Sequence, residues 1–162
     1  MPLSIYKQIV DTIVTRLQGI VGDGGATFWY TPNAVYAVSW ISELALKADK
    51  QVLYLLVPDD LENEELTFTT TLGRARLDLA ACRRYERPGD DPASSQETRW
   101  NVQSKLEQDA KKRLRTALTV GGLELHTEIP ISDFSAENTY DPGWAVVFMH
   151  LEIQFTHTDG TP

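Results

Sequence analysis

The chain has few side chains of the kinds that carry out metal or acid–base chemistry. Its three histidines are His126, His150 and His157. His150 and His157 belong to one strand-like segment at an odd spacing, so they face opposite sides of a strand and cannot bind one metal ion within a chain. The single cysteine, Cys82, excludes an internal disulfide and a thiolate zinc cluster. Its apolar neighbours predict a buried core thiol.

Motifs for nucleotide binding and nucleophilic catalysis are missing from the sequence. Gly22, Gly24 and Gly25 follow a helical segment instead of a strand, so they do not form a dinucleotide-binding loop. There is no phosphate-binding glycine loop with its lysine, and no G-x-S-x-G nucleophile elbow. We therefore predict no enzymatic activity and no cofactor.

A run of acidic residues separates two strand-like segments. It lacks the alternating oxygen ligands and the central glycine of a calcium loop, so it does not predict a cation site. The simplest interpretation is a solvated loop. The acidic residues of this run are Asp59, Asp60, Glu62, Glu64 and Glu65.

Two basic clusters close a strand and a helix, and they allow two interpretations. In the first, they complement the helix dipole and keep the protein soluble. In the second, they pair with the acidic run of a neighbouring copy, which would join subunits head to tail into a ring. The strand cluster is Arg83, Arg84 and Arg87, and the helix cluster is Lys111, Lys112, Arg113 and Arg115.

The elements that must position these residues are organised around the segment from Trp144 to His157. Alternate residues form an unbroken apolar row on one face, whereas the other face begins apolar and ends polar. This pattern predicts a strand covered by helices on one face and buried only in its first half on the other. It would span about 45 Å, so we expect its far end to project and to pair with a neighbouring chain. The polar positions are His150, Glu152, Gln154 and Thr156.

Three other segments have helical periodicity. The segment over 96–118 carries one apolar stripe. The segment over 34–49 is less clear, because 35–38 alone would also suit a strand. The N-terminal segment carries a stripe of Ile5, Ile9, Ile13, Leu17 and Val21, and the glycines from Gly22 onward end this helix.

The remaining segments indicate strands and loops. Apolar residues over 51–57 predict a strand that stops at Pro58. Alternation within 66–87 predicts a half-exposed strand, in which Gly73 is expected to form a bulge or turn. Another strand is expected over 123–131, followed by a long polar loop over 132–143.

Composition sets the class of protein. With 42% hydrophobic and 23% charged residues, the 162 residues suit one globular domain, 1–162. The order of elements predicts an α+β fold with a mixed, mainly antiparallel sheet and helices packed on one face. No apolar run reaches the ~20 residues of a membrane helix, and no signal peptide is recognisable, so we expect a cytoplasmic protein until it is assembled. The net charge of −8 disfavours gripping nucleic acid through its phosphates.

The order of elements resembles that of a viral family. The N-terminal amphipathic helix, ATFWY at 26–30, the helix before the penultimate strands and GWAVVFMHLEIQF at 143–155 look like tail terminator or tail-completion proteins of long-tailed bacteriophages, the family of the lambda minor tail protein U. The resemblance implies a virion ring, usually of six copies, that caps the tail tube and meets the head-completion or neck proteins. It implies that the protein has no cofactor and no catalytic activity. It also implies that DNA passes through the channel of the ring without specific binding.

The contacts of such a ring are expected at the acidic run, at the polar end of the last strand and at the loop over 132–143. Two other functions are compatible with the sequence. One is another neck or tail-joining component. The other is a small soluble ligand-binding or enzymatic domain with a pocket lined by Trp29, Trp40 and Trp100, although these side chains also suit core or interface packing.

Overall fold

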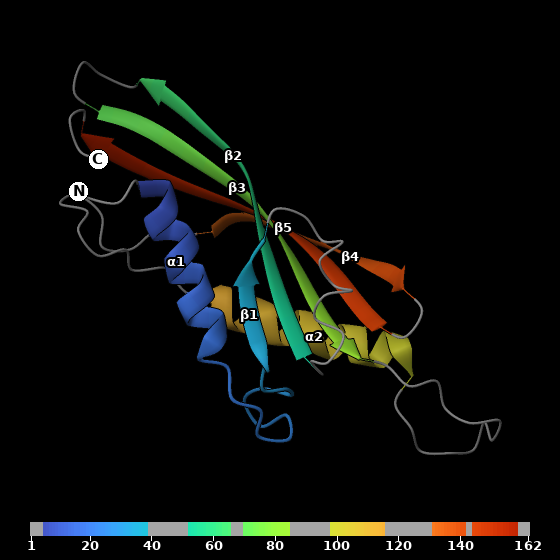
Figure 1. Cartoon of the computed structure of the whole chain (residues 1–162). Coiled ribbons are helices and arrows are strands. Elements are labelled where there is room, and N and C mark those ends of the chain that lie inside the picture. The colour runs from blue at the N-terminus through green and yellow to red at the C-terminus, as the bar shows by residue number, and fades with distance from the viewer. Residues whose placement is uncertain are drawn as a thin grey trace.

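The computed structural model describes residues 5–38, 52–65, 70–84, 98–115, 131–141 and 144–158. They form two helices packed on one face of a five-stranded sheet with strand order β1-β2-β3-β5-β4 (Figure 1). β1 runs parallel to β2, and the other neighbours are antiparallel, which confirms the predicted α+β fold. The elements are α1 (Ile5–Gln18), β1 (Ala34–Ala37), β2 (Val52–Glu65), β3 (Thr70–Arg84), α2 (Arg99–Leu114), β4 (Ile131–Asp141) and β5 (Trp144–Thr158).

The helix α1 buries the predicted stripe except for its last member. Val21 is 65% exposed, because the helix ends at Gln18 and the chain turns at Gly19, whose N–H donates to the carbonyl of Arg16. Ile20 is buried in its place. The stripe residues that do pack on the sheet are Ile5, Ile9, Ile13 and Leu17.

The helix α2 begins at Arg99 and ends at Leu114, inside the predicted range. Its last turn carries the predicted basic residues, where cations interact favourably with the helix dipole. Trp100 is 69% exposed at the start of the helix and takes no part in the core. The buried stripe contains Val102, Leu106, Ala110 and Leu114.

The two faces of β5 differ as predicted. The apolar row from Ala145 to Phe155 lies in the main core, against both helices. On the opposite face, which we call the outer face, Val146 is buried and Phe148 is half-buried. Farther along the same face His150 is exposed. The outer face is therefore apolar at the start of the strand and polar at its end.

Most of β5 has no free edge, whereas its far end projects as predicted, and the pairing of that end with a neighbouring chain stays a prediction. β5 is an inner strand, paired with β3 along its length and with β4 from Trp144 to Ile153. Only Gln154–Thr158 extends past β4. The predicted polar loop over 132–143 is wrong, because these residues mostly form the strand β4, which lies at the edge of the sheet and is poor in the apolar alternation that marks inner strands.

The strand β2 does not stop at Pro58, and the acidic run is not a loop. β2 continues to Glu65, so the run forms its second half. The register with β3 shifts between Pro58 and Asp60, which leaves Asp59 as a bulge residue without a partner. Pairing with β1 has ended at Leu56, so the missing N–H of Pro58 costs no bond on that side.

Gly73 forms neither a bulge nor a turn. It lies in a continuous stretch of β3, opposite Asn63 on one side and Phe155 on the other. A Cβ atom there would come within 2.3 Å of the Phe155 ring. The glycine is needed because the aromatic ring fills the space that a side chain would occupy.

Three strands extend beyond β1 and β4 and form a projection (Figure 1, upper left). It consists of the second half of β2, the start of β3 and the end of β5. At the base of the sheet, a second apolar cluster on the outer face contains Leu53, Leu55 and Cys82, so the predicted burial of the thiol is confirmed. Residues 35–38, for which both a helix and a strand were considered, include most of β1. The expected helix beyond them and most of the expected strand over 123–131 lie outside the described residues.

Candidate functional site

The outer face of the projection carries a charged network centred on Arg76 of β3. Its Nη1 atom donates to Glu62 Oε1 on β2 at 2.7 Å, and its Nε atom donates to Glu152 Oε2 on β5 at 3.3 Å. The three residues meet because the two strand pairings bring β2 and β5 to opposite sides of β3. The network therefore joins the acidic run to the polar end of the last strand, two segments that the sequence predicts as separate contact regions.

Hydrogen bonds set the ionisation of this network. The side-chain amide of Gln154 donates to Glu152 Oε1 at 3.2 Å and, together with Arg76, lowers the pKa of that carboxyl below its usual value. The carboxylates of Glu62 and Glu152 raise the pKa of Arg76. Both shifts favour the charged forms of Glu152 and Arg76, so this pair is a fixed ion pair and not a proton donor or acceptor.

A second pair lies beside this network on the outer face. His150 Nδ1 is 2.6 Å from Asp78 Oδ1, and the two residues are opposite each other in the register of β3 and β5. Both side chains are accessible to solvent, with relative exposures of 46% and 32%. The pair has the residue types of the His–Asp part of a catalytic triad. Both groups lie on an open sheet surface, however, and not in a closed site.

The other end of the molecule is built on a buried carboxylate, Asp109 of α2. Its two oxygens accept the backbone N–H groups of Trp29 and Tyr30 at 2.8 and 2.9 Å. The side chain is 1% exposed. Burial raises the pKa of Asp109, and the two N–H groups oppose that rise. Asp109 thus fixes the aromatic segment that follows α1 against α2.

Each aromatic ring of this segment faces a cation. Arg83 lies over the Tyr30 ring at 4.4 Å and also donates to the Tyr30 hydroxyl at 3.2 Å. Such contacts are worth about 0.5–1 kcal/mol each at exposed sites. The other two pairs are Lys105 over Trp29 at 4.4 Å and Lys112 over Phe28 at 5.8 Å.

A groove of about 430 Å³ lies along α1, and Arg113 of α2 contributes to its lining. It is open to solvent, and Arg113 Nε crosses its end to donate to the main-chain carbonyl of Arg16 at 2.8 Å. Gly19 leaves room for this arginine, since a Cβ there would come 2.5 Å from Arg113 Nη2. We call this feature the helix groove, and it is lined by Asp11, Thr12, Thr15, Arg16 and Arg113.

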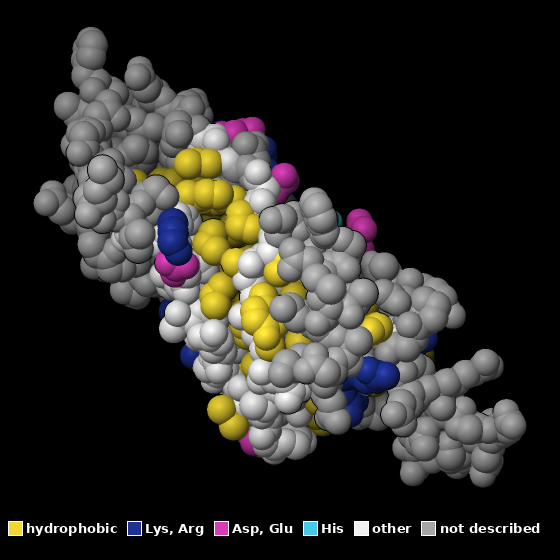
Figure 2. Space-filling view, viewed as in Figure 1, with side chains coloured by type: hydrophobic (Ala, Val, Ile, Leu, Met, Phe, Trp, Pro, Cys, Tyr) yellow, Lys and Arg dark blue, Asp and Glu magenta, His cyan; other side chains and the backbone are white. Residues whose placement is uncertain are grey.

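The acidic run and the arginines of the strand cluster lie at opposite ends of β3, since the run pairs with the start of the strand and Arg83 and Arg84 end it. Figure 2 shows Asp and Glu side chains along β2 toward the projection, and it also shows charged side chains of both signs elsewhere on this face of the molecule. Along β3, Arg76 and Arg84 are separated by about 27 Å of extended chain. The acidic run therefore lies too far from Arg84 to pair with it within one copy of the chain.

The structure divides the predicted contact residues into several groups. Arg83 is engaged with Tyr30, whereas Arg84 is exposed at the end of β3. Asp59 and Glu62 are exposed on the projection. Glu152, Gln154 and Thr156 are half-buried on β5. Asp60, Glu64 and Glu65 belong to β2 by their backbone, with side chains outside the description, and Arg87 lies outside the described residues altogether.

Sequence reasoning missed Asp109 and the part played by Arg76. Asp109 lies on the apolar stripe of α2, between Leu106 and Ala110, and a carboxylate at such a position indicates a buried partner. Of the tryptophans considered for a pocket, Trp29 donates to Gln108 and Trp100 is exposed, and neither lines the helix groove. Trp40 lies outside the described residues.

Within the described segments, no three His, Cys, Asp or Glu side chains form a group that could hold a metal ion. Neither α1 nor α2 is long and apolar enough to cross a membrane. No protein-family model matches the chain, and no match was found among curated proteins.

Proposed function

We propose that the chain is a structural protein of a long bacteriophage tail, which caps the tail tube as a ring of identical subunits and provides the tail side of the head–tail junction. The observation that carries the proposal is the distance along one sheet between the acidic run on β2 and Arg83 and Arg84 at the end of β3. A subunit with an acidic patch at one end and a basic patch at the other is suited to a head-to-tail contact, which closes into a ring when the rotation between neighbours allows it.

The strands and helices hold the charged groups of this proposed contact in fixed positions. Arg76 fixes the carboxylates of Glu62 and Glu152 on paired strands, and Asp109 fixes the aromatic segment next to the basic end of α2. Charged groups held in place lose less entropy on association than mobile ones do. Complementary patches also speed encounter and disfavour wrong orientations.

The net charge of −8 agrees with a ring through which DNA passes. A channel wall of like charge repels the DNA phosphates instead of binding them. The proposed partners are therefore other copies of the chain, the tail tube protein on one side and head-completion or neck proteins on the other.

Deleting the gene from a phage that encodes this chain tests the proposal. We expect tails of abnormal length, or complete tails that fail to join heads, when particles are viewed by electron microscopy. Supplying the protein from a plasmid should restore normal particles. Normal tails and heads in the deletion would contradict the proposal, and intact tails of normal length that lack only the joint would assign the chain to another neck component.

A further inference from the structure

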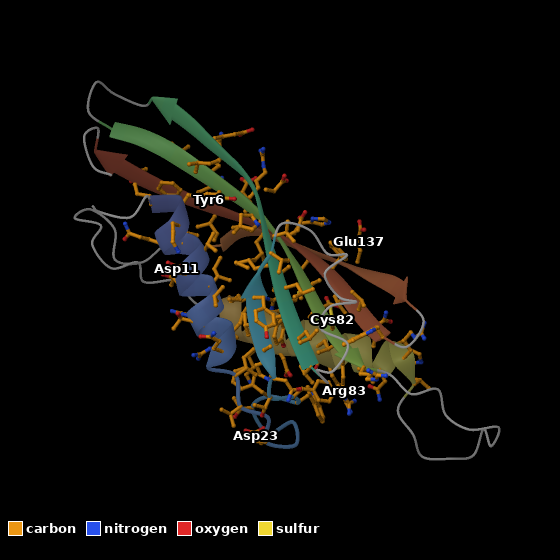
Figure 3. All side chains as sticks on the ribbon, viewed as in Figure 1. Tyr6, Asp11, Asp23, Cys82, Arg83 and Glu137 are labelled. Carbon is orange, nitrogen blue, oxygen red and sulfur yellow. The ribbon has the colours of Figure 1, made fainter. Side chains whose placement is uncertain are left out.

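Residues 22–31, between α1 and β1, form a closed turn that we call the strap (Figure 3, at the label of Asp23). Its base is joined by Gly22, whose N–H donates to the Thr31 hydroxyl at 2.8 Å. Within the turn, the Asp23 carboxylate accepts the N–H of Thr27 at 2.7 Å. This bond is the largest cause of a lowered pKa at Asp23, so the acceptor stays ionised at neutral pH. The strap therefore keeps its shape through bonds within itself.

The body of the protein holds both ends of the strap. Before the strap, Ile20 is fully buried, and its N–H donates to the Leu17 carbonyl. After the strap, the N–H of Asn33 donates to the Val52 carbonyl at 2.9 Å, and the Asn33 side chain accepts the Val52 N–H at 2.8 Å. A movement of the strap is thus confined between two fixed points.

Between these points, side chains of α2 attach the strap to the helix. Asp109 accepts the backbone N–H groups of Trp29 and Tyr30. Lys112 Nζ donates to the Thr27 carbonyl at 3.0 Å. The lysine bond is exposed to solvent, whereas Asp109 is buried, so the two bonds to Asp109 contribute more to the polar attachment.

Closing the strap removes the Asp109 carboxylate from water. Burial raises its pKa, the N–H groups of Trp29 and Tyr30 and the charge of Lys112 oppose that rise, and the charge of Asp23 adds to it. The rise remains after these opposing effects. The bonds to the strap therefore offset only part of the cost of burying the charge.

β2 and β3 bring two more described groups to this contact. Burial raises the pKa of the Tyr54 phenol on β2, and the nearby Asp109 carboxylate adds to the rise, so this group stays neutral. Arg83 of β3 lies over the Tyr30 ring and stays charged at all relevant pH values. Titration of Asp109 is therefore the proton-linked event expected at the contact between strap and α2.

We infer that the strap opens and closes on α2 as one unit, and that the Asp109 carboxylate is the latch that holds it closed. Local openings of this kind use less free energy than global unfolding, because most of the core stays packed. An open strap changes the surface of α2 around Asp109 and Lys112 while the sheet stays in place. The device belongs to the single subunit, so the inference does not rest on the proposed function.

The latch makes opening depend on pH. The pKa of Asp109 is raised in the closed form, whereas a hydrated Asp carboxyl has a pKa of about 3.9. Protonation therefore favours the closed form. This advantage is complete below about pH 3.9 and is lost as the pH rises through the raised pKa.

Hydrogen–deuterium exchange of the full-length protein, measured by mass spectrometry, tests the inference. After correction for intrinsic rates, the slowest amides of the strap should exchange about tenfold or more faster than those of β5 over 145–153, with a weaker dependence on urea. Protection of the strap should fall as the pH is raised from about 4 to about 7. A strap that is as protected as β5 and equally sensitive to urea overturns the inference, because it opens only when the whole chain unfolds.

Asp109→Asn tests the latch. The amide does not titrate and accepts at only one of its two positions, so protection of the strap should fall about tenfold at neutral pH and lose its pH dependence. Glu107→Gln, on the same helix, is the control and should leave protection and pH dependence at the wild-type values. A pH dependence that persists in Asp109→Asn overturns the assignment of the latch.

Gly24 and Gly25 provide a matched pair of variants that leave Asp109 intact. Their φ angles are 78° and 96°, so alanine strains the backbone at either position. A Cβ at Gly24 meets nothing within 4 Å, whereas one at Gly25 lies 2.4 Å from the Trp29 ring. Gln108 holds that ring in the closed form, since it accepts the Trp29 Nε1–H at 3.2 Å.

Opening the strap frees the Trp29 ring to turn away from an added methyl group. Gly25→Ala should therefore lower the protection of the strap several-fold more than Gly24→Ala does. Circular dichroism of both variants should match the wild-type spectrum. Equal protection in the two variants overturns the inference, because the closed strap would then not depend on the contact between the ring and Gly25.

Discussion

Arg113 Nε donates a hydrogen bond to the main-chain carbonyl of Arg16 at 2.8 Å, and this contact ties the last turn of α2 to the last turn of α1. The bond places the positive charge of Arg113 at the end of α1, where the C-terminal carbonyl groups of a helix favour positive charge. It also fixes the packing of the two helices beside the helix groove.

Asp109 is expected to be the most sensitive polar residue of the described core. Replacement by Asn keeps the shape but places an NH₂ group against one of the N–H groups of Trp29 and Tyr30, so a buried donor loses its acceptor. We predict a loss of about 1–3 kcal/mol in the free energy of unfolding, measured by urea denaturation. Glu107→Gln, on the same helix in a partly exposed pair with Lys111, should cost less than about 0.5 kcal/mol. Equal losses in the two variants would contradict this role of Asp109.

Gly73 and Phe155 should show strong energetic coupling. Gly73→Ala forces a methyl group against the ring and should destabilise the fold by about 1–3 kcal/mol. Phe155→Leu removes the ring and leaves room for that methyl group. A double-mutant cycle should therefore give a double variant that is less destabilised than the sum of the two single variants. Additive losses would show that the ring does not occupy the space beside Gly73.

Substitution of Tyr54 by Phe should not lower the stability of the fold. Its side chain is fully buried, its hydroxyl makes no hydrogen bond with any described residue, and burial raises the pKa of the phenol. Tyr54→Phe removes a desolvated hydroxyl without loss of a partner, so stability should stay unchanged or rise by up to about 1 kcal/mol. A loss above about 1 kcal/mol would show that the hydroxyl has a partner.

The charged network on the outer face predicts an acid-dependent stability. Hydrogen bonds from Gln154 and Arg76 lower the pKa of Glu152 in the folded state, whereas in the unfolded chain it returns to about 4.3. The network therefore stabilises the fold above about pH 4.3, and this contribution disappears as the pH falls through the lower folded pKa. Glu152→Gln should reduce the urea midpoint at pH 7, and its difference from wild type should shrink as the pH falls below about 4.3. A difference that stays constant as the pH falls would refute the linkage.

Sequence patterns predicted the inner elements better than the outer ones. The alternation in β5 and the stripes of α1 and α2 are strong because these elements bury one face completely. β4 was taken for a loop, because an edge strand tolerates polar residues on both faces. The length of β2 was missed because Pro58, which usually ends a strand, lies at a bulge where pairing with β1 has already stopped.

The candidate site was predicted only in part. The acidic run and the polar positions of β5 were selected as separate surfaces, and their union through Arg76 depends on the order of strands, which no local pattern specifies. The helix groove depends on the packing of α1 against α2, and its two arginines are 97 residues apart in sequence. Long-range contacts of this kind leave no periodic signal.

The claim that copies of this chain join through opposite charges is tested most directly by the mass of the purified protein in solution. Native mass spectrometry and light scattering at low ionic strength should give one closed multiple of the 18.2 kDa subunit, and raising the salt should dissociate it. A mass of one subunit at low salt and at all accessible concentrations would contradict the account. So would an assembly whose mass does not respond to salt.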